Sequence, residues 1–182
     1  MTTKIGFCGS HSVGKTTLTR RLHEDVPDSY LVSEVARNYT PEDLKECKTQ
    51  KKILADQIRE EVYASLWAEV VITDRTVIDN AAYLVSVCGL NQEYELLPLL
   101  HNWTGTYDVI FFCPIENIPI VSDGFRFTDN SGRVLTELRI KKYIGVLQRK
   151  HKGIFVCLSG NENARYETVK QTLTRYPVDG DW

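Results

Sequence analysis

An apolar run at residues 4–8 leads into a Gly-x4-Gly-Lys-Thr motif that spans Gly9 to Thr16, and a helical pattern follows at once. This order of strand, glycine-rich turn and helix start predicts a loop that binds phosphate groups, whereas an ordinary Gly/Ser turn would not need that context. Glycines let backbone N–H groups turn toward phosphate oxygens without obstruction from side chains. The Lys15 ammonium would reach the terminal phosphates, and the Thr16 hydroxyl would hold Mg²⁺. The residues expected to bind the triphosphate are Gly9, Ser10, His11, Ser12, Val13, Gly14, Lys15, Thr16 and Thr17.

Asp74 and Arg75 lie at the end of an apolar run that we expect to be a strand. Asp74 ends the run Val-Val-Ile-Thr-Asp, where a carboxylate suits the Mg²⁺ shell either directly or through water. Asp74 also precedes a helical pattern, so it could cap that helix, and both roles can hold together. Arg75 could reach the oxygens of a transferring phosphoryl group, or it could form a salt bridge at the surface.

Glu34 follows the short apolar run that ends near Ser33. A carboxylate at this position could accept the proton of an attacking hydroxyl, and it would position that nucleophile as well. The alternative is a surface glutamate in a loop. Glu34 is therefore a candidate general base.

Residues 122–133 form a polar, glycine-containing stretch that carries Arg126 and Arg133. Such a loop between a strand and a helix suits a lid that closes over phosphates. Arginine charge stabilises the negative charge that spreads over a phosphoryl group in its transition state. The alternative is a solvated connection.

The elements that would position these residues alternate along the chain. Apolar strands are expected at residues 4–8, 30–33, 69–74, 107–113 and 154–158, with helices at 17–23, from Pro41 to Leu66, at 77–87, 92–101 and 133–151, and after Asn161. Strands that are apolar throughout and alternate with helices indicate an α/β fold with a five-stranded parallel sheet covered on both faces. Because ligands bind at the carboxyl ends of such strands, Glu34, Asp74 and Arg75 should converge on the phosphate loop. We expect a single domain over residues 1–182.

Composition excludes several other classes. Charged residues make up 25% of the chain and the net charge is −2, which does not favour binding to nucleic acid. The five cysteines show no CxxC pairing, so we expect reduced thiols in a cytoplasmic protein. The sequence shows no signal-peptide pattern and no apolar run as long as a membrane span.

Four segments in order, GSHSVGKT, SEVARN, ITDRTVIDNAAY and DGFRFTDNSGR, resemble the P-loop nucleoside and nucleotide kinases. The resemblance covers roughly residues 4–175 and is closest to the small AAA-type ATPase and nicotinamide riboside kinase-like group, with similarity to deoxynucleoside kinases. It implies a three-layer P-loop NTPase fold with kinase-type strand order, ATP and Mg²⁺ as cofactors, Glu34 as the base, and Asp74–Arg75 as the acid-Arg pair. Arg126 and Arg133 would be lid arginines. Thr76 and Val35 stand where deoxynucleoside kinases often have Ser and Pro.

These features together predict an ATP-dependent kinase that phosphorylates a hydroxyl of a nucleoside-type substrate, such as a deoxynucleoside or a nicotinamide riboside-like molecule. The acceptor could instead be a nucleoside monophosphate, with Arg37 and Arg59 as extra cations. It could also be a modified-base hydroxyl in DNA, such as that of 5-hydroxymethyluridine, held by the basic run from Arg139 to Lys152. A regulatory NTP-binding ATPase switch is the alternative from another class.

Overall fold

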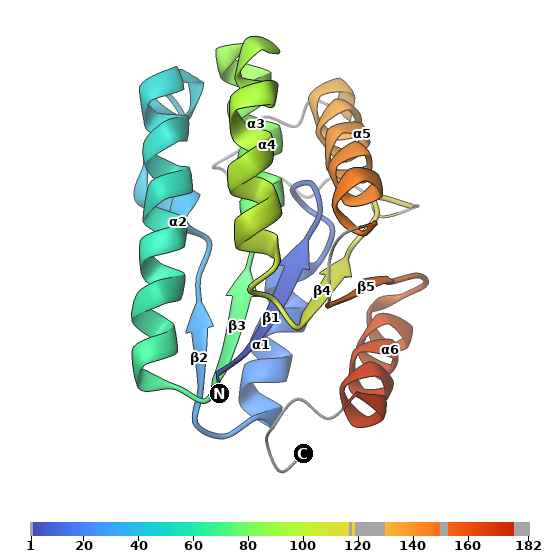
Figure 1. Cartoon of the computed structure of the whole chain (residues 1–182). Helices are drawn as coiled ribbons and strands as arrows, with labels where there is room; N and C mark the ends of the chain where they lie inside the picture. The colour runs from blue at the N-terminus through green and yellow to red at the C-terminus, as the bar shows by residue number, and fades with distance from the viewer. Residues whose placement is uncertain (1, 117, 119–129, 150–152, 177–182) are drawn as a thin grey trace.

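A computed structural model describes residues 2–116, 118, 130–149 and 153–176. Within these residues, five parallel strands form one sheet in the order β2-β3-β1-β4-β5, so the predicted parallel sheet is confirmed (Figure 1). This order places β1 at the centre, directly below the loop that it feeds. The strands are β1 (Thr3–Cys8), β2 (Ser29–Val32), β3 (Val70–Asp74), β4 (Val109–Phe112) and β5 (Ile154–Cys157).

Helices cover both faces of the sheet. Side chains of α1 and α6 pack against one face, while α2, α3, α4 and α5 cover the other. The sheet is therefore the middle of three layers, as the α/β pattern predicted. The helices are α1 (Lys15–Asp25), α2 (Cys47–Trp67), α3 (Val77–Cys88), α4 (Asn91–Thr104), α5 (Asn130–Leu147) and α6 (Glu162–Arg175), with 3-10 turns η1 (Val35–Asn38) and η2 (Asp43–Lys45) before α2.

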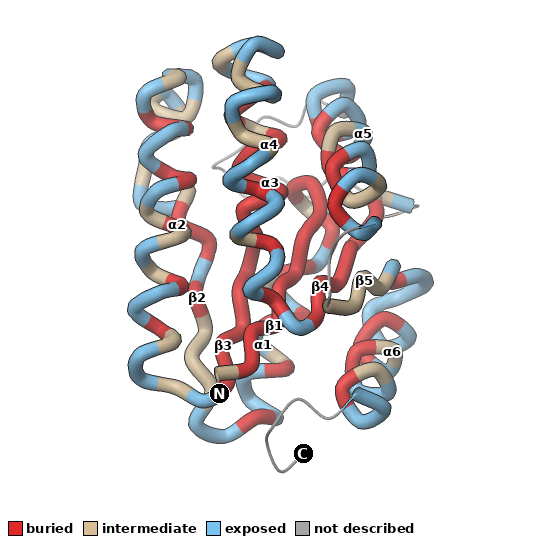
Figure 2. Tube along the Cα trace, viewed as in Figure 1, coloured by how far each residue is buried: buried red, intermediate tan, exposed pale blue. Residues whose placement is uncertain are grey.

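The core forms because successive side chains of each strand point to opposite faces. Ile5 and Phe7 of β1 join the cluster under α1 and α6, whereas Cys8 joins the cluster under α3 and α5. Figure 2 shows that β1, β3 and β4 are buried along their length. No helix in the described part of the chain is long and apolar enough to cross a membrane.

Helix α2 differs from its predicted amphipathic pattern. The expected apolar stripe of Leu54, Ile58, Val62 and Leu66 is buried only in its first half, and Leu66 is 73% exposed. The buried face instead carries Gln57 and Glu61, both completely buried. The Glu61 carboxylate accepts hydrogen bonds from Gln57, Tyr107, Trp103 and the Lys4 ammonium, so a polar network replaces apolar packing there. Polar side chains that hydrogen-bond to one another can be buried in place of apolar ones.

Two helix boundaries also differ from the prediction. The helix expected to start at Pro41 begins at Cys47, because Glu46 has extended backbone angles and separates η2 from α2. The helix around Pro98 continues as α4 from Asn91 to Thr104, instead of ending near His101. Proline in a helix costs one hydrogen bond but does not have to end the helix.

The cysteines contradict the expectation that they are all reduced. Cys47 at the start of α2 and Cys88 at the end of α3 form a disulfide across 41 residues. Cys8, Cys113 and Cys157 are free thiols. The spacing of the pair carries no CxxC signal, since two helix ends bring the cysteines together only in the folded chain.

Candidate functional site

The phosphate loop runs from the end of β1 to the start of α1, as the motif predicted. Gly14 has φ 86°, a left-handed conformation that glycine adopts without steric cost, and α1 begins at the next residue. A Cβ at Gly9 would collide with the Cys113 carbonyl oxygen, so the close approach of the residue that follows β4 requires glycine there. The unpaired N–H groups of the first turn of α1 therefore face the loop, which makes it suited to bind an anion.

The other predicted loop residues differ in burial. Ser10, His11, Val13 and Lys15 are buried, Ser12 and Thr16 are half-buried, and Thr17 is exposed. The Lys15 ammonium donates hydrogen bonds to the carbonyl oxygens of Gly9 (2.8 Å) and Ser10 (2.6 Å), so this cation lies directly at the loop.

Thr16 and Asp74 meet as expected from their sequence positions. The Thr16 hydroxyl donates a hydrogen bond to Asp74 Oδ2 at 2.6 Å, and Asp74 Oδ1 is buried without a hydrogen-bond partner among the described residues. Asp74 is 4% exposed at the carboxyl end of β3. One hydroxyl and one carboxylate beside a phosphate site suit Mg²⁺, which keeps water and phosphate oxygens as its other ligands. Thr16 and Asp74 therefore fit a magnesium ion.

Asp79 is a site residue that the sequence prediction missed. Its completely buried carboxylate accepts a hydrogen bond from the Gly9 amide at 2.7 Å and also caps α3 through the amide and hydroxyl of Thr76. The Thr-x-x-Asp spacing is a capping-box signal, so the helix start could have been recognised. The bond to Gly9 could not, because 70 residues separate the two.

Glu34 and Arg75 form a buried ion pair next to the loop. Arg75 Nε donates to Glu34 Oε1 at 2.7 Å, and both side chains are 3% exposed. Arg37 pairs with the other Glu34 oxygen at 3.2 Å. Burial by itself lowers the pKa of the Arg75 guanidinium, but Tyr83 and Asp79 beside it raise the pKa above its ordinary value. Arg75 therefore stays charged and fixes the Glu34 carboxylate.

The backbone of Arg75 is also unusual, because its φ of 113° lies in a region that side chains rarely adopt. Such strain persists only where surrounding contacts hold it, and it is common at functional sites. Here the carbonyl of Arg75 accepts a hydrogen bond from Gln57, and its guanidinium lies over the Tyr83 ring at 4.8 Å. These contacts and the ion pair with Glu34 hold Arg75 in this conformation.

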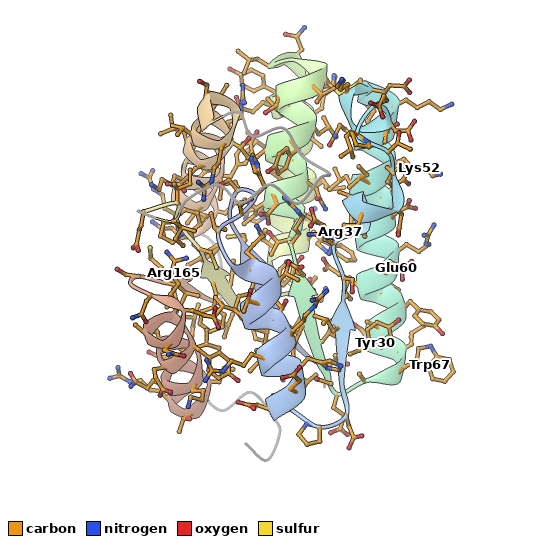
Figure 3. All side chains as sticks on the ribbon, turned by 180° about the vertical axis from the view of Figure 1, so that it is seen from behind. Tyr30, Arg37, Lys52, Glu60, Trp67 and Arg165 are labelled. Carbon is orange, nitrogen blue, oxygen red and sulfur yellow. A yellow bond between two sulfur atoms is a disulfide. The ribbon has the colours of Figure 1, made fainter. Side chains whose placement is uncertain are left out.

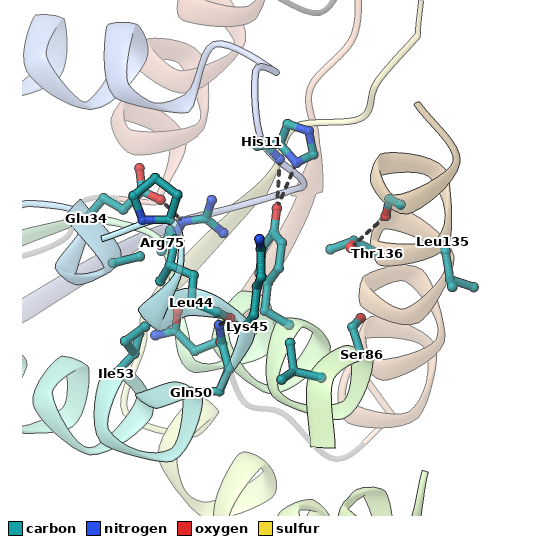
Figure 4. Close-up of a pocket in the computed structure, with 16 residues that line it drawn as sticks. His11, Glu34, Leu44, Lys45, Gln50, Ile53, Arg75, Ser86, Leu135 and Thr136 are labelled. Carbon is teal, nitrogen blue, oxygen red and sulfur yellow. Dashed lines mark hydrogen bonds and ion pairs between the residues drawn. The ribbon is translucent and has the colours of Figure 1, made fainter. Parts of the chain in front are cut away.

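A cavity of about 670 Å³ opens beside this pair (Figure 4). His11 of the phosphate loop and Glu34 lie on its wall, so one cavity adjoins both the loop and the carboxylate. Its other walls come from η2, α2, α3 and α5, through Leu44, Lys45, Gln50, Ile53, Asn80, Tyr83, Ser86, Leu135 and Thr136. This volume is in the range of small-molecule sites.

Two polar side chains of α3 face this cavity. The Tyr83 hydroxyl accepts a hydrogen bond from the His11 amide and contacts the His11 ring nitrogen Nδ1, both at 3.1 Å. Asn80 is 3% exposed, and its Nδ2 group has no hydrogen-bond partner within the described structure. A buried amide donor without a partner is costly, so it is suited to a ligand. Nothing in the sequence pointed to Asn80.

Of the two expected lid arginines, the structure describes Arg133 alone. Arg126 lies outside the described residues, as does most of the segment 122–133. Arg133 lies in α5 and is 2% exposed, and its guanidinium donates to the carbonyl oxygens of His11, Ser12 and Ile118. Burial lowers the pKa of Arg133. Arg133 thus contacts the outside of the phosphate loop, which the sequence did not predict.

Comparison with solved structures shows the same fold in nucleotide-binding proteins. A deoxyadenosine kinase from M. mycoides with products dCMP and dCDP is 14% identical, with a TM-score of 0.68 over 94% of this chain and 99% of that one. Thymidylate kinase from Candida albicans is 14% identical, with a TM-score of 0.73 over 97% and 93%. NadR in complex with NR is 21% identical, with a TM-score of 0.69 over 96% of this chain, which spans about half (51%) of NadR.

No curated protein matches the sequence significantly. The family described as AAA domain matches residues 4–156, which include the phosphate loop, Glu34, Asp74 and Arg75. The strand order and the structural neighbours agree with the expected P-loop kinase fold. The chain therefore belongs to the AAA domain family, with the fold of the P-loop nucleoside and nucleotide kinases.

Proposed function

We propose that this protein is an ATP-dependent phosphotransferase that moves the γ-phosphate to a hydroxyl of a nucleoside-type acceptor. The observation that carries the proposal is the cavity that adjoins both the phosphate loop and the buried Glu34 carboxylate. A donor site and a candidate base on one cavity are what transfer to a bound hydroxyl requires. An ATPase switch needs the loop but has no use for an acceptor cavity.

Each side chain has a role in this proposal. Lys15 and the loop amides bind the triphosphate, and Thr16 and Asp74 hold Mg²⁺, which would neutralise phosphate charge. Glu34 accepts the proton of the acceptor hydroxyl, while Arg75 keeps that carboxylate in place at 2.7 Å. Arg126, from the segment outside the described residues, retains its expected role on the phosphoryl group, whereas Arg133 donates its hydrogen bonds to the outside of the loop.

The two cations expected to serve a nucleoside monophosphate are paired with acidic side chains. Arg37, one of the extra cations that a monophosphate would need, pairs with Glu34. Arg59, the other, pairs with Asp56 and Glu60 and does not line the cavity. The Asn80 amide and Gln50 are neutral groups that could hydrogen-bond the acceptor. These contacts support a nucleoside, either a deoxynucleoside or a nicotinamide riboside-like molecule.

The basic run on α5 gives little support to a DNA acceptor. Lys141 pairs with Glu137, and Lys142 pairs with Glu93. Arg139 donates to the Ser86 hydroxyl. Since acidic or polar side chains already contact these cations, they would offer only part of their charge to phosphates.

A coupled assay of ADP release tests the proposal across deoxynucleosides, ribonucleosides, nicotinamide riboside, nucleoside monophosphates and hydroxymethylated DNA. We expect turnover that depends on a nucleoside acceptor and on Mg²⁺, and no turnover in Lys15→Ala. Glu34→Gln should lower kcat about 100-fold or more, because general-base catalysis contributes about 10²–10⁴-fold.

Glu69→Gln is the matched control, since Glu69 is exposed and precedes β3 at the opposite end of the sheet. It should leave turnover unchanged. Full activity in Glu34→Gln would remove Glu34 as the base. Slow ATP hydrolysis that no acceptor stimulates would favour the switch and contradict the phosphotransferase.

A further inference from the structure

Three consecutive carbonyl groups of the phosphate loop accept hydrogen bonds from two buried arginines. Arg133 donates to the carbonyl oxygens of His11 at 3.1 Å and Ser12 at 2.8 Å. Arg165 donates to the carbonyl oxygen of Val13 at 3.1 Å. The two arginines come from α5 and α6, more than 120 residues along the chain, so the contacts are entirely tertiary.

Arg165 also joins the loop to two neighbouring segments. It lies in the first turn of α6 (Figure 3) and donates to the carbonyls of Gly160 (2.9 Å) and Pro114 (3.1 Å) and to the Glu116 carboxylate (3.1 Å). Its side chain is only 2% exposed. Residues 114–116 follow β4 and Gly160 follows β5, so this one guanidinium connects the loops after three neighbouring strands.

Stability of the fold is a weak explanation for burying these two guanidinium groups, because burying a charge costs free energy. Desolvation of an ion costs several kcal/mol, and an apolar cluster of the same volume is often as stable. Within the described residues, the Arg133 guanidinium donates its hydrogen bonds to backbone carbonyls. Both arginines therefore use their fork of N–H groups mainly to hold backbone oxygens, a geometry that lysine cannot reproduce.

The consequence for the loop follows from peptide geometry. A trans peptide is planar, so its N–H points opposite to its C=O. If the carbonyls of His11, Ser12 and Val13 point outward to the arginines, the next amides, those of Ser12, Val13 and Gly14, point away from them. Nearby positive charge also polarises each peptide toward a stronger N–H donor.

We propose that Arg133 and Arg165 are positioning residues that orient the Ser12, Val13 and Gly14 amides toward the phosphates of a bound nucleotide. The role does not require either arginine to touch the nucleotide. It rests on triphosphate binding by the loop, which is one part of the proposed function, and does not depend on the identity of the acceptor.

The test measures ADP and inorganic tripolyphosphate binding by calorimetry, so it needs no acceptor and no turnover. Arg165→Gln and Arg133→Gln should each weaken both ligands about tenfold or more, because a charge-assisted bond to a loop carbonyl is lost. Arg165→Lys keeps the positive charge but loses the planar set of N–H donors, so it should still weaken binding of both ligands severalfold. In assays of turnover, the KM for ATP should rise in Arg165→Lys while the KM for the acceptor stays unchanged.

Arg175→Gln is the control, since Arg175 is an exposed arginine at the other end of α6. It should bind ADP like the wild type. Added guanidinium ions should restore much of the ADP affinity of Arg165→Ala and leave wild-type affinity unchanged. A folded Arg165→Lys with wild-type affinity for ADP would overturn the proposal for Arg165, and so would a lower melting temperature with unchanged affinity.

If the glutamine variants do not fold, Arg165→Lys and the guanidinium rescue of Arg165→Ala provide the test. Loss of acceptor phosphorylation with normal ADP binding would count against the phosphotransferase and leave the positioning role intact. Normal phosphorylation with unchanged ADP affinity in every arginine variant would count against the positioning role alone.

Discussion

Asp79 gives the sharpest single test of how the loop is held. Its Oδ1 accepts from the Gly9 amide at 2.7 Å, and its Oδ2 accepts from the Thr76 amide at 2.9 Å and the Thr76 hydroxyl at 3.0 Å. In Asp79→Asn, one oxygen becomes an NH₂ group, so either Gly9 or Thr76 loses its acceptor and faces a donor instead.

The magnitude follows from these contacts. A buried N–H without a partner costs about 1–3 kcal/mol, and bonds to a charged group are at the strong end of that range. Loss of the α3 cap would cost about 0.5–2 kcal/mol. Since only one of the two oxygens is lost, we expect a decrease of about 1–3 kcal/mol in the free energy of unfolding.

Urea unfolding at pH 7 and ADP calorimetry would measure the two consequences. If the new amide nitrogen faces Gly9, ADP affinity should fall about tenfold, which corresponds to about 1.4 kcal/mol, because the loop loses a bond that holds its first residue. Asp108→Asn is the control: Asp108 is exposed, and its Oδ2 accepts a bond from the Lys4 amide at 2.8 Å, far from the loop. It should cost less than about 1 kcal/mol and leave ADP binding unchanged.

An Asp79→Asn protein that unfolds within about 0.5 kcal/mol of the wild type and binds ADP normally would refute the reasoning. A loss of stability without any loss of ADP affinity would show that Asp79 matters as the cap of α3 and not through its contact with the loop. In that case the bond to Gly9 would not control nucleotide binding.

Two further predictions concern stability. Cys47→Ser, or reduction of the Cys47–Cys88 disulfide, should lower the free energy of unfolding by about 4 kcal/mol, as expected from chain entropy for a closed loop of this length. Its control, Cys157→Ser, removes an exposed free thiol and should have little effect, and equal losses in both variants would contradict the pairing. Burial raises the pKa of Glu116, but bonds from the Gly160 amide, Ser159 and Arg165 lower it below its ordinary value. The ionised form is therefore favoured in the folded state, so its contribution is present at neutral pH and is lost as the pH falls below about 4. The difference in stability between wild type and Glu116→Gln should shrink over that range in urea titrations, and a constant difference would argue against the Glu116–Arg165 pair.

The sheet and the position of the phosphate loop could be predicted because their signals are local. Apolar runs report burial on both faces, and the motif around Gly9 to Thr16 specifies a turn whose conformation depends on its own glycines. The convergence of Glu34, Asp74 and Arg75 was also predictable, because parallel strands bring their carboxyl ends to one edge of the sheet.

The mispredicted parts depend on partners far along the chain. The buried face of α2 was misassigned because Glu61 is polar, and only its contacts with Lys4, Trp103 and Tyr107 make its burial stable. The disulfide was missed for a similar reason, since two helix ends that are remote in sequence meet only after folding.

The amino-acid sequence by itself determined a phosphate loop on a parallel α/β sheet, because glycine conformation and strand hydrophobicity act between near neighbours. Only the tertiary structure decided which groups hold that loop. Asp79 and Arg165 reach Gly9 and Val13 from 70 and 152 residues away. Hydrogen bonds of this kind have no periodicity in the sequence, since they depend on where helices pack and not on what lies beside each residue.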